Sequence, residues 1–149
     1  MGKLLIDDEG RFCGYASIFG QPDNSGDVMM PGAFEKSLSL RGADRIKMLF
    51  QHDPKEIVGR WDRIKEDDHG LWVEGRLTSA VPRADALQRL IARGAMDGLS
   101  IGYRTIKATR KHGGGRRLWQ VDLWEISLVT FPMMEACRIV AQPSAEQLA

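Results

Sequence analysis

Asp97-Gly98-Leu99-Ser100-Ile101-Gly102-Tyr103 places a single hydroxyl between two glycines inside an apolar segment. If residues 99–106 are extended, successive side chains alternate between two faces, so Ser100 shares its face with Gly98 and Gly102. A strip without other side chains lets a substrate backbone approach closely, which is one physical reason for glycine inside a strand. We interpret Ser100 as a candidate nucleophile. The alternative is an ordinary strand of small residues packed beneath a helix.

The length and composition of the chain fit one domain with a core of its own. A chain of 149 residues with 43% hydrophobic side chains buries most of its unfolded surface on folding. We predict a single domain over residues 1–141 and a frayed tail over residues 142–149. No stretch approaches the roughly 20 apolar residues that span a bilayer, and the charged start of the chain lacks the apolar core of a signal peptide. We therefore expect a soluble, intracellular protein without a membrane segment.

The charge and the cysteine content argue against several functional classes. The formal net charge is +1, from 21 basic and 20 acidic side chains, which leaves no electrostatic footprint for nucleic acid or an anionic lipid surface. Cys13 and Cys137 lie far apart and lack CxxC spacing, so the sequence indicates neither a disulfide framework nor a zinc site. The loop 20–27 contains Asp23 and Asp27 but not the glutamate of an EF-hand. We expect no metal and no cofactor.

Strands and helices alternate around the Ser100 stretch. The helix predicted just before it spans Pro82–Arg93, where apolar residues recur at helical spacing and Gly94 supplies a left-handed stop. A second helix is predicted between Pro31 and Gly42. The predicted strands cover residues 11–19, 45–52, 58–66, 71–77, 99–111, 116–131 and 138–141. This order predicts an α+β domain whose mainly antiparallel sheet is curled or closed into a β-barrel and flanked by helices.

A serine nucleophile needs a base to take its proton, and His52 is the best placed of the three histidines. It ends an apolar row on one face of the predicted strand 45–52. His69 lies in an acidic turn and His112 at a glycine-rich hairpin tip, positions that are typical of solvated residues. The alternative interpretation of His52 is a hydrogen-bonded histidine at the edge of the sheet.

The acid that would orient this base is sought in the predicted strand 116–131. At the odd positions of that strand, Glu125 interrupts an otherwise apolar face. A buried carboxylate needs a partner, which either His52 or an arginine would supply. Asp122 lies on the even face and is the second choice. Asp53 is too close in sequence to His52 to orient it easily.

Other nucleophiles and motifs find little support. Cys137 is intrinsically reactive when ionised, but only the neighbouring Arg138 would favour its ionisation. The GxSxG, SxxK and HExxH motifs are missing from the sequence, as is a phosphate-binding glycine loop. Arg104 and Arg138 are weak candidates for the group that stabilises an oxyanion, which backbone N–H groups would supply equally well.

Several ordered blocks give the sequence its resemblance to a known family. They are Gly14-Tyr15-Ala16-Ser17, Gly26-Asp27, Pro31-Gly32-Ala33-Phe34, Lys47-Met48-Leu49-Phe50-Gln51-His52-Asp53-Pro54, Gly70-Leu71-Trp72-Val73-Glu74-Gly75, Asp97-Gly98-Leu99-Ser100-Ile101-Gly102 and Asp122-Leu123-Trp124-Glu125-Ile126-Ser127-Leu128-Val129-Thr130-Phe131-Pro132. Together these blocks cover most of the chain. On them the sequence resembles the prohead, or capsid-maturation, serine proteases of tailed phages.

The resemblance implies a serine endopeptidase related to the herpesvirus assembly proteases, whose fold is a β-barrel surrounded by helices. It places the family's histidine on His52, its serine on Ser100 and its proposed acid on Glu125. Such proteases work inside the immature capsid in the bacterial host cytoplasm, cleave the scaffolding part of the major capsid protein and often cleave themselves. The herpesvirus group also implies self-association into a homodimer or higher oligomer. Many relatives carry a longer C-terminal tail, from which this sequence departs.

Two other functional classes are kept as alternatives. A non-enzymatic capsid-assembly or scaffold module would use the same barrel, with Ser100 and His52 too far apart to react. A small nucleic-acid-binding barrel is disfavoured by the near-neutral net charge. We predict a peptide-bond hydrolase with the catalytic residues His52, Ser100 and Glu125.

Overall fold

Eight strands, two α-helices and a short 3-10 helix make up residues 5–142, the part of the chain that the computed structural model describes. In chain order they are β1 (Arg11–Ile18), β2 (Val28–Met29), α1 (Glu35–Arg41), η1 (Ala43–Arg45), β3 (Lys47–Phe50), β4 (Asp53–Glu66), β5 (Gly70–Leu77), α2 (Pro82–Ala92), β6 (Gly98–Arg110), β7 (Arg116–Val129) and β8 (Ile139–Ala141). All seven predicted strands and both predicted helices are present, whereas the sequence did not indicate β2. Most of the predicted tail, residues 143–149, lies outside the described residues.

The strands form one open, mixed sheet. The strand order is β2-β7-β3-β4-β5-β1-β8, and β6 pairs with the remaining edge of β7. β7 runs parallel to β2 and β3 and antiparallel to β6. The closed, mainly antiparallel barrel predicted from the sequence is not confirmed. Between β6 and β1 the sheet stays open because the segment before β8 reaches only the start of β6, through a bridge of Gly98 and Arg138.

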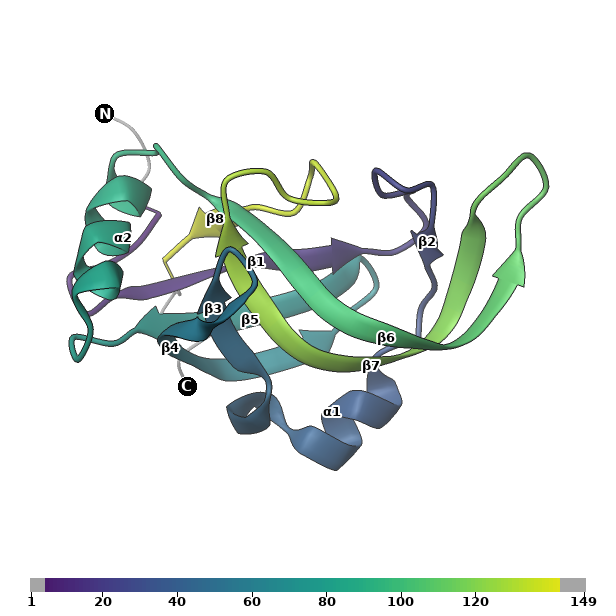
Figure 1. Ribbon diagram of the computed structural model, residues 1–149, viewed down its shortest axis with the longest axis horizontal. Coiled ribbons are helices and arrows are strands. Elements are labelled where there is room, and N and C mark those ends of the chain that lie inside the picture. Colours follow the sequence, from purple (N-terminus) through teal and green to yellow (C-terminus); the bar gives the residue numbers. More distant parts are fainter. Residues whose placement is uncertain (1–4, 143–149) are drawn as a thin grey trace.

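Figure 1 shows β6 and β7 as a long, curved hairpin, with α1 beneath β7 and α2 at the left end of the sheet. The helix α2 buries Ala84, Leu87 and Ile91 in the core. Of these, Leu87 and Ile91 lie on the apolar face predicted from the sequence, whereas Leu90, predicted on the same face, is 42% exposed. Ser37 connects the helix α1 to β7. Its Oγ donates a hydrogen bond to the Val121 carbonyl and accepts one from the Leu123 N–H. Burying one aliphatic side chain contributes about 1.5–3 kcal/mol, so Leu87 and Ile91 hold α2 firmly against the core. No helix within residues 5–142 combines the length and the apolar content needed to cross a membrane.

Asp27 fastens the β1–β2 loop to the start of β7. Its Oδ2 accepts a hydrogen bond from Arg116 Nη2 at 2.8 Å, and its Oδ1 accepts one from the backbone N–H of Arg116 at 3.0 Å. The Arg116 guanidinium holds the pKa of the Asp27 carboxyl below its usual range, against the opposing effect of burial. Because this partner is lost on unfolding, the folded chain binds the proton at Asp27 less tightly than the unfolded chain does.

The substitution Asp27→Asn is expected to destabilise the fold at neutral pH and much less in acid. The carboxylate stabilises the folded state above its ordinary pKa of about 4, and this stabilisation is lost as the pH falls through the lowered folded value. Urea unfolding at pH 7, 5 and 3 therefore gives a difference from wild type that shrinks towards pH 3. Asp44→Asn, at an exposed position of η1, is the control. An equal difference at every pH would contradict the prediction.

Candidate active site

Ser100 lies opposite Ser127 in the β6–β7 hairpin. The antiparallel register pairs Ser100 with Ser127 and Gly102 with Glu125. Directly opposed residues of an antiparallel pair project to the same face of the sheet. Ser100, Ser127 and Glu125 therefore share one face, which we call the serine face. The opposite face of the hairpin carries core side chains such as Leu99, which is fully buried.

A bulge brings Glu125 to the serine face. The register shifts between Gly102 and Tyr103, which leaves Trp124 as an extra residue on β7. Leu123, just before the bulge, belongs to the core, whereas Glu125, just after it, points the other way. The prediction that Glu125 interrupts the apolar face of a regular strand is therefore wrong, because the bulge breaks the alternation on which it rested.

His52 lies in the two-residue turn between β3 and β4. Gln51 and His52 have φ angles of 54° and 61°, as in a type I′ turn. A non-glycine residue in this left-handed region costs about 1–2 kcal/mol, so the surrounding structure must hold the turn. Leu128 and Ser127 do so: the Leu128 carbonyl accepts from the Gln51 N–H at 2.9 Å, and Ser127 Oγ accepts from the His52 N–H at 3.1 Å. The predicted position of His52 at a strand end is wrong, and the residues predicted to turn the chain, Asp53-Pro54, begin β4 instead.

The imidazole of His52 contacts the carboxylate of Glu125. Its Nδ1 lies 2.8 Å from Oε2 and 3.1 Å from Oε1. A carboxylate only accepts hydrogen bonds, so this contact requires the proton on Nδ1 and leaves Nε2 as the nitrogen that can act as a base. Ser127 Oγ donates to Glu125 Oε1 at 3.0 Å and fixes the carboxylate from a second direction. The Glu125 side chain is 7% exposed and that of His52 is 42% exposed, so a buried acid orients an accessible base.

Ser100 is the free hydroxyl of the serine face. The residue is 5% exposed, and its Oγ makes no hydrogen bond with any residue between 5 and 142. Bonds between a nucleophile and its base are often long or misaligned until a substrate binds. On the side of β6 away from β7, the Leu99 N–H donates to the Cys137 carbonyl, and by alternation the Ile101 N–H points to the same side.

The glycines that flank Ser100 make room for the protein's own groups. A Cβ on Gly102 would lie 2.6 Å from both Cγ and Cδ of Glu125. A Cβ on Gly98 would lie 2.6 Å from the Val129 carbonyl oxygen. The interpretation of this strip as bare space for a substrate is therefore wrong, because neighbouring side chain and backbone atoms fill it.

The substitution Gly102→Ala is expected to lower turnover while the fold persists. The new methyl group must push the Glu125 carboxylate out of its place, and a displacement of about 1 Å in a catalytic group costs about a hundredfold in rate. The measurement is kcat for a peptide substrate, with circular dichroism to verify the fold. The new methyl group would clash with the Glu125 side chain and not with backbone atoms. We therefore expect the variant to remain folded. A folded variant with wild-type kcat would show that the position of Glu125 does not matter.

The remaining histidines and the second-choice acid lie apart from this group. His69 packs edge-on against the ring of Tyr15, with centroids 4.7 Å apart. His112 is exposed in the tip of the β6–β7 hairpin, as predicted. Asp122 is bound by Arg41 of α1 at 3.0 Å. None of these contacts involves the serine face.

Cys137 and the two arginines considered for the oxyanion are also otherwise engaged. Burial raises the pKa of the Cys137 thiol to about 12, which keeps it protonated and unreactive at neutral pH. The Arg138 guanidinium donates to Asp97 at 2.8 Å and to Glu135 at 2.9 Å. Arg104 lines a groove beside α1.

Ser127 is the functional candidate that the sequence reasoning missed. It is fully buried and connects the backbone of His52 to the carboxylate of Glu125. Its spacing of two residues from Glu125 was a usable signal, because such residues share a face of any strand. Between residues 5 and 142, no group of three or more His, Cys, Asp or Glu side chains is arranged to hold a metal ion.

Comparison by sequence relates the chain to phage proteases. Residues 3–149 match the profile of a family described as caudovirus prohead serine protease. The prohead protease of Enterobacteria phage HK97 is 36% identical over 141 residues, which cover 93% of this chain and 62% of the relative. This chain therefore spans less than two thirds of the length of that relative.

Comparison by structure relates the fold to herpesvirus proteases. The protease of Kaposi's sarcoma-associated herpesvirus in complex with a hexapeptide phosphonate inhibitor has a TM-score of 0.62 and 16% identity, covering 91% of this chain and 66% of that chain. The same viral protease in complex with an allosteric inhibitor has a TM-score of 0.55 and 16% identity, and the match covers 92% of this chain and 80% of that chain. The fold is herpesvirus-protease-like, with helices around a many-stranded sheet.

Proposed function

Because this chain belongs to the caudovirus prohead serine protease family, we propose that it is a serine endopeptidase that acts in the maturation of phage proheads. The observation that carries the proposal is the contact of His52 Nδ1 with Glu125, made on the hairpin face that carries Ser100. A serine, a base and a buried acid that holds the base are the parts required for nucleophilic peptide cleavage. In the proposed roles Ser100 is the nucleophile, His52 the general base and Glu125 the acid that orients it.

The proposed reaction proceeds through an acyl-enzyme. His52 Nε2 removes the proton from Ser100 Oγ as the oxygen attacks the scissile carbonyl carbon, and Glu125 stabilises the imidazolium that forms. His52 then gives this proton to the leaving amine as the peptide C–N bond breaks. A water molecule, activated by His52 Nε2, then hydrolyses the ester of the acyl-enzyme and restores the Ser100 hydroxyl. Ser127 holds both the turn of His52 and the carboxylate of Glu125, so it acts as a positioning residue.

The substrate is proposed to bind as an added strand along the outer edge of β6. The N–H of Ile101, next to Ser100, points away from β7 and is available for pairing with an extended peptide. Such pairing would bring a scissile carbonyl beside Ser100 Oγ. The protease of Kaposi's sarcoma-associated herpesvirus, which has a similar fold, is known in complex with a hexapeptide phosphonate inhibitor, which is a peptide-based ligand.

The biological substrate is proposed to be the scaffolding part of the major capsid protein, with cleavage of the protease itself as a second reaction. Both assignments rest on the family and on the HK97 relative. The site of action would be the interior of the immature capsid in the bacterial host. Self-association into a dimer is proposed from the similarity to a herpesvirus protease that is known in complex with a dimer disruptor.

The test is co-expression of the chain with the major capsid protein of the same phage genome. Intact mass of the capsid protein is measured with wild type, Ser100→Ala and, as a matched serine control, Ser79→Ala in the loop before α2. We expect loss of an N-terminal or C-terminal segment with wild type and with Ser79→Ala, and an uncut capsid protein with Ser100→Ala. Uncut capsid protein in the presence of wild type, combined with stable association of the two proteins, would favour the non-enzymatic assembly module.

A further inference from the structure

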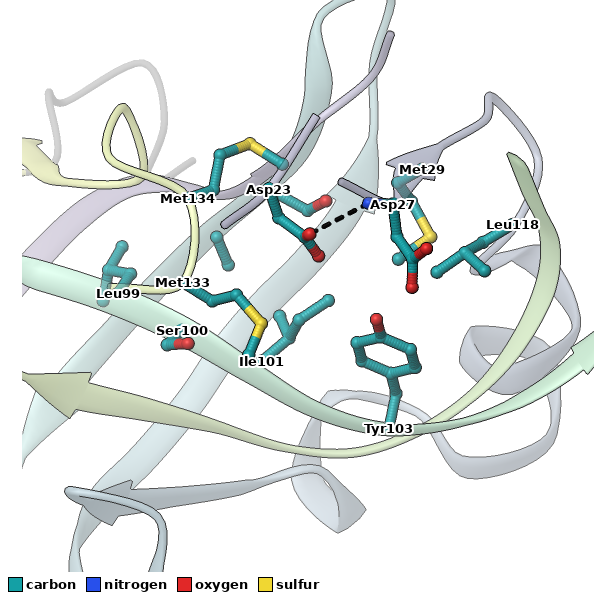
Figure 2. Close-up of a pocket in the computed structure, with 12 residues that line it drawn as sticks. Asp23, Asp27, Met29, Leu99, Ser100, Ile101, Tyr103, Leu118, Met133 and Met134 are labelled. Atoms are coloured by element: carbon teal, nitrogen blue, oxygen red, sulfur yellow. Dashed lines mark hydrogen bonds between the residues drawn. The ribbon is translucent and has the colours of Figure 1, made fainter. Parts of the chain in front are cut away.

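A cleft opens on the core side of β6, directly beside Ser100. Figure 2 shows Leu99 and Ser100 at one end of it and Asp27, Tyr103 and Leu118 at the other, with Asp23 between them. In the segment after β7, Met133 lies next to Ser100 and Ile101, and Met134 lies beside Asp23. A peptide strand on the edge of β6 alternates its side chains between the two faces. Its carbonyl can therefore meet Ser100 Oγ while its side chain enters this cleft.

The walls of the cleft are apolar and partly adjustable. Apolar side chains line the cleft: Met29, Leu99, Ile101, Met133 and Met134. The space that admits a water-sized sphere is only about 30 Å³, so a longer side chain enters when a wall moves. Met133 is 51% exposed, and an unbranched thioether changes rotamer easily. A straight methylene chain suits such a narrow cleft better than a branched or aromatic side chain does.

Between its two ends the cleft carries the negative charge of Asp23. Both carboxylate oxygens of Asp27 are bonded to Arg116. The carboxylate of Asp23 has no cationic partner among residues 5–142; its Oδ1 accepts from Ser25 and from the Asp27 N–H, which leaves Oδ2 unused. Burial, followed by the charges of Asp23 and Asp27, raises the pKa of Tyr103 against the opposing charge of Arg116.

A buried hydroxyl in the same cleft lacks a partner. Ser17, on β1, lines the cleft and is 2% exposed, and its Oγ has no hydrogen-bond partner within the described part of the chain. A buried polar group without a partner destabilises the fold, because it has lost its hydrogen bonds to water. Such groups are rare in folded proteins, and a polar group of a bound ligand is one way to satisfy them.

We infer that this cleft binds the substrate side chain on the residue that supplies the scissile carbonyl, and that it selects lysine. The methylene chain of the lysine lies between Ile101 and the two methionines after β7, Met133 and Met134. Its ammonium group binds Asp23 Oδ2. Ser17 Oγ supplies a second acceptor for the ammonium group. The inference rests on the proposed serine endopeptidase activity, because it assigns the specificity of that same site.

The test compares two peptidyl diphenyl phosphonates that differ only in their terminal side chain, lysine or norleucine. Ser100 Oγ forms a bond to phosphorus, phenol leaves with the proton, and intact mass gives the rate of labelling. We expect lysine to react about tenfold or more faster, as for a hydrogen bond between charged groups. Asp23→Asn keeps the Oδ1 acceptor and should bring the ratio close to one. Asp85→Asn, an exposed carboxylate of α2, should leave the ratio unchanged.

A second measurement on wild type needs no variant. The ratio of the two labelling rates should fall as sodium chloride rises from 0.05 to 0.5 M, because salt screens the contact between ammonium and carboxylate. Equal rates, or a lysine preference that survives in Asp23→Asn, would overturn the inference and leave the proposed function standing. If neither phosphonate nor a simple alkyl fluorophosphonate labels Ser100, the proposed function fails and the inference fails with it.

Discussion

Ser100→Ala is expected to abolish labelling of the chain by an alkyl fluorophosphonate and to lower peptide hydrolysis by about a million-fold in kcat. In wild type the hydroxyl attacks phosphorus, fluoride leaves and a single mass increment appears. His52→Ala should lose the increment as well, because the proposed base that removes the Ser100 proton, His52 Nε2, is then absent. The measurement is intact mass after incubation of wild type and both variants, at low and high protein concentration.

The controls separate the proposed pair from incidental reactivity. Cys137→Ala should label like wild type, because burial keeps that thiol protonated. Dependence of labelling on protein concentration would connect activity to the proposed self-association. An adduct that persists in Ser100→Ala would place the nucleophile elsewhere. Labelling of His52→Ala at the wild-type rate would remove His52 from the mechanism.

Glu125→Gln is expected to lower kcat by about a thousandfold to ten-thousandfold while the chain still folds. The amide has nearly the same shape as the carboxylate and can still contact Ser127, but its NH₂ group disfavours a proton on His52 Nδ1. The tautomer with Nε2 free to act as a base is then lost. The measurements are kcat and KM on a peptide substrate, with thermal unfolding as the test of folding. KM should change little, because Glu125 is not placed to contact the substrate.

Asp122→Asn is the matched control, because the sequence alone made Asp122 the second choice for the orienting acid. Its carboxylate binds Arg41 of α1, and both partners are partly exposed. Such pairs contribute about 0–1 kcal/mol to stability, so the variant should fold and keep kcat within about twofold of wild type. A loss of kcat equal to that of Glu125→Gln would reassign the orienting role.

The turn that carries His52 links local strain to the proposed chemistry. Two consecutive left-handed residues without glycine occur where a hairpin would ordinarily select Asn-Gly. The Gln51 side chain strengthens the hold of β7 on the turn, since its amide donates to Thr130 Oγ1 at 2.7 Å and its oxygen accepts from the Thr130 N–H at 3.2 Å. The end of β7 therefore fixes both the acid and the base, which explains how a surface turn keeps a defined imidazole position.

Much of the fold followed from local sequence patterns. The period of apolar residues and the glycine at its end predicted α2 almost to the residue, because capping and amphipathicity are local properties. The hairpin of β6 and β7 was predicted from two apolar runs around a glycine-rich tip. By contrast, β2 is two residues long and pairs with a distant part of β7, so it leaves no periodic signal of its own.

By itself, the sequence determined which side chains were candidates for the site: one serine between glycines, one histidine near an apolar strand and one carboxylate in a buried strand. The tertiary structure alone decided that His52 contacts Glu125 and that Ser100 shares a face of the hairpin with this acid. The bulge at Trp124 sets the face of Glu125, the left-handed turn sets the position of His52, and the register sets Ser127 opposite Ser100. The parallel pairing of β3 with β7 brings His52 next to Glu125, although the two residues are more than 70 positions apart in the sequence. A bulge and a long-range pairing depend on contacts with other strands, which no local pattern of residues encodes.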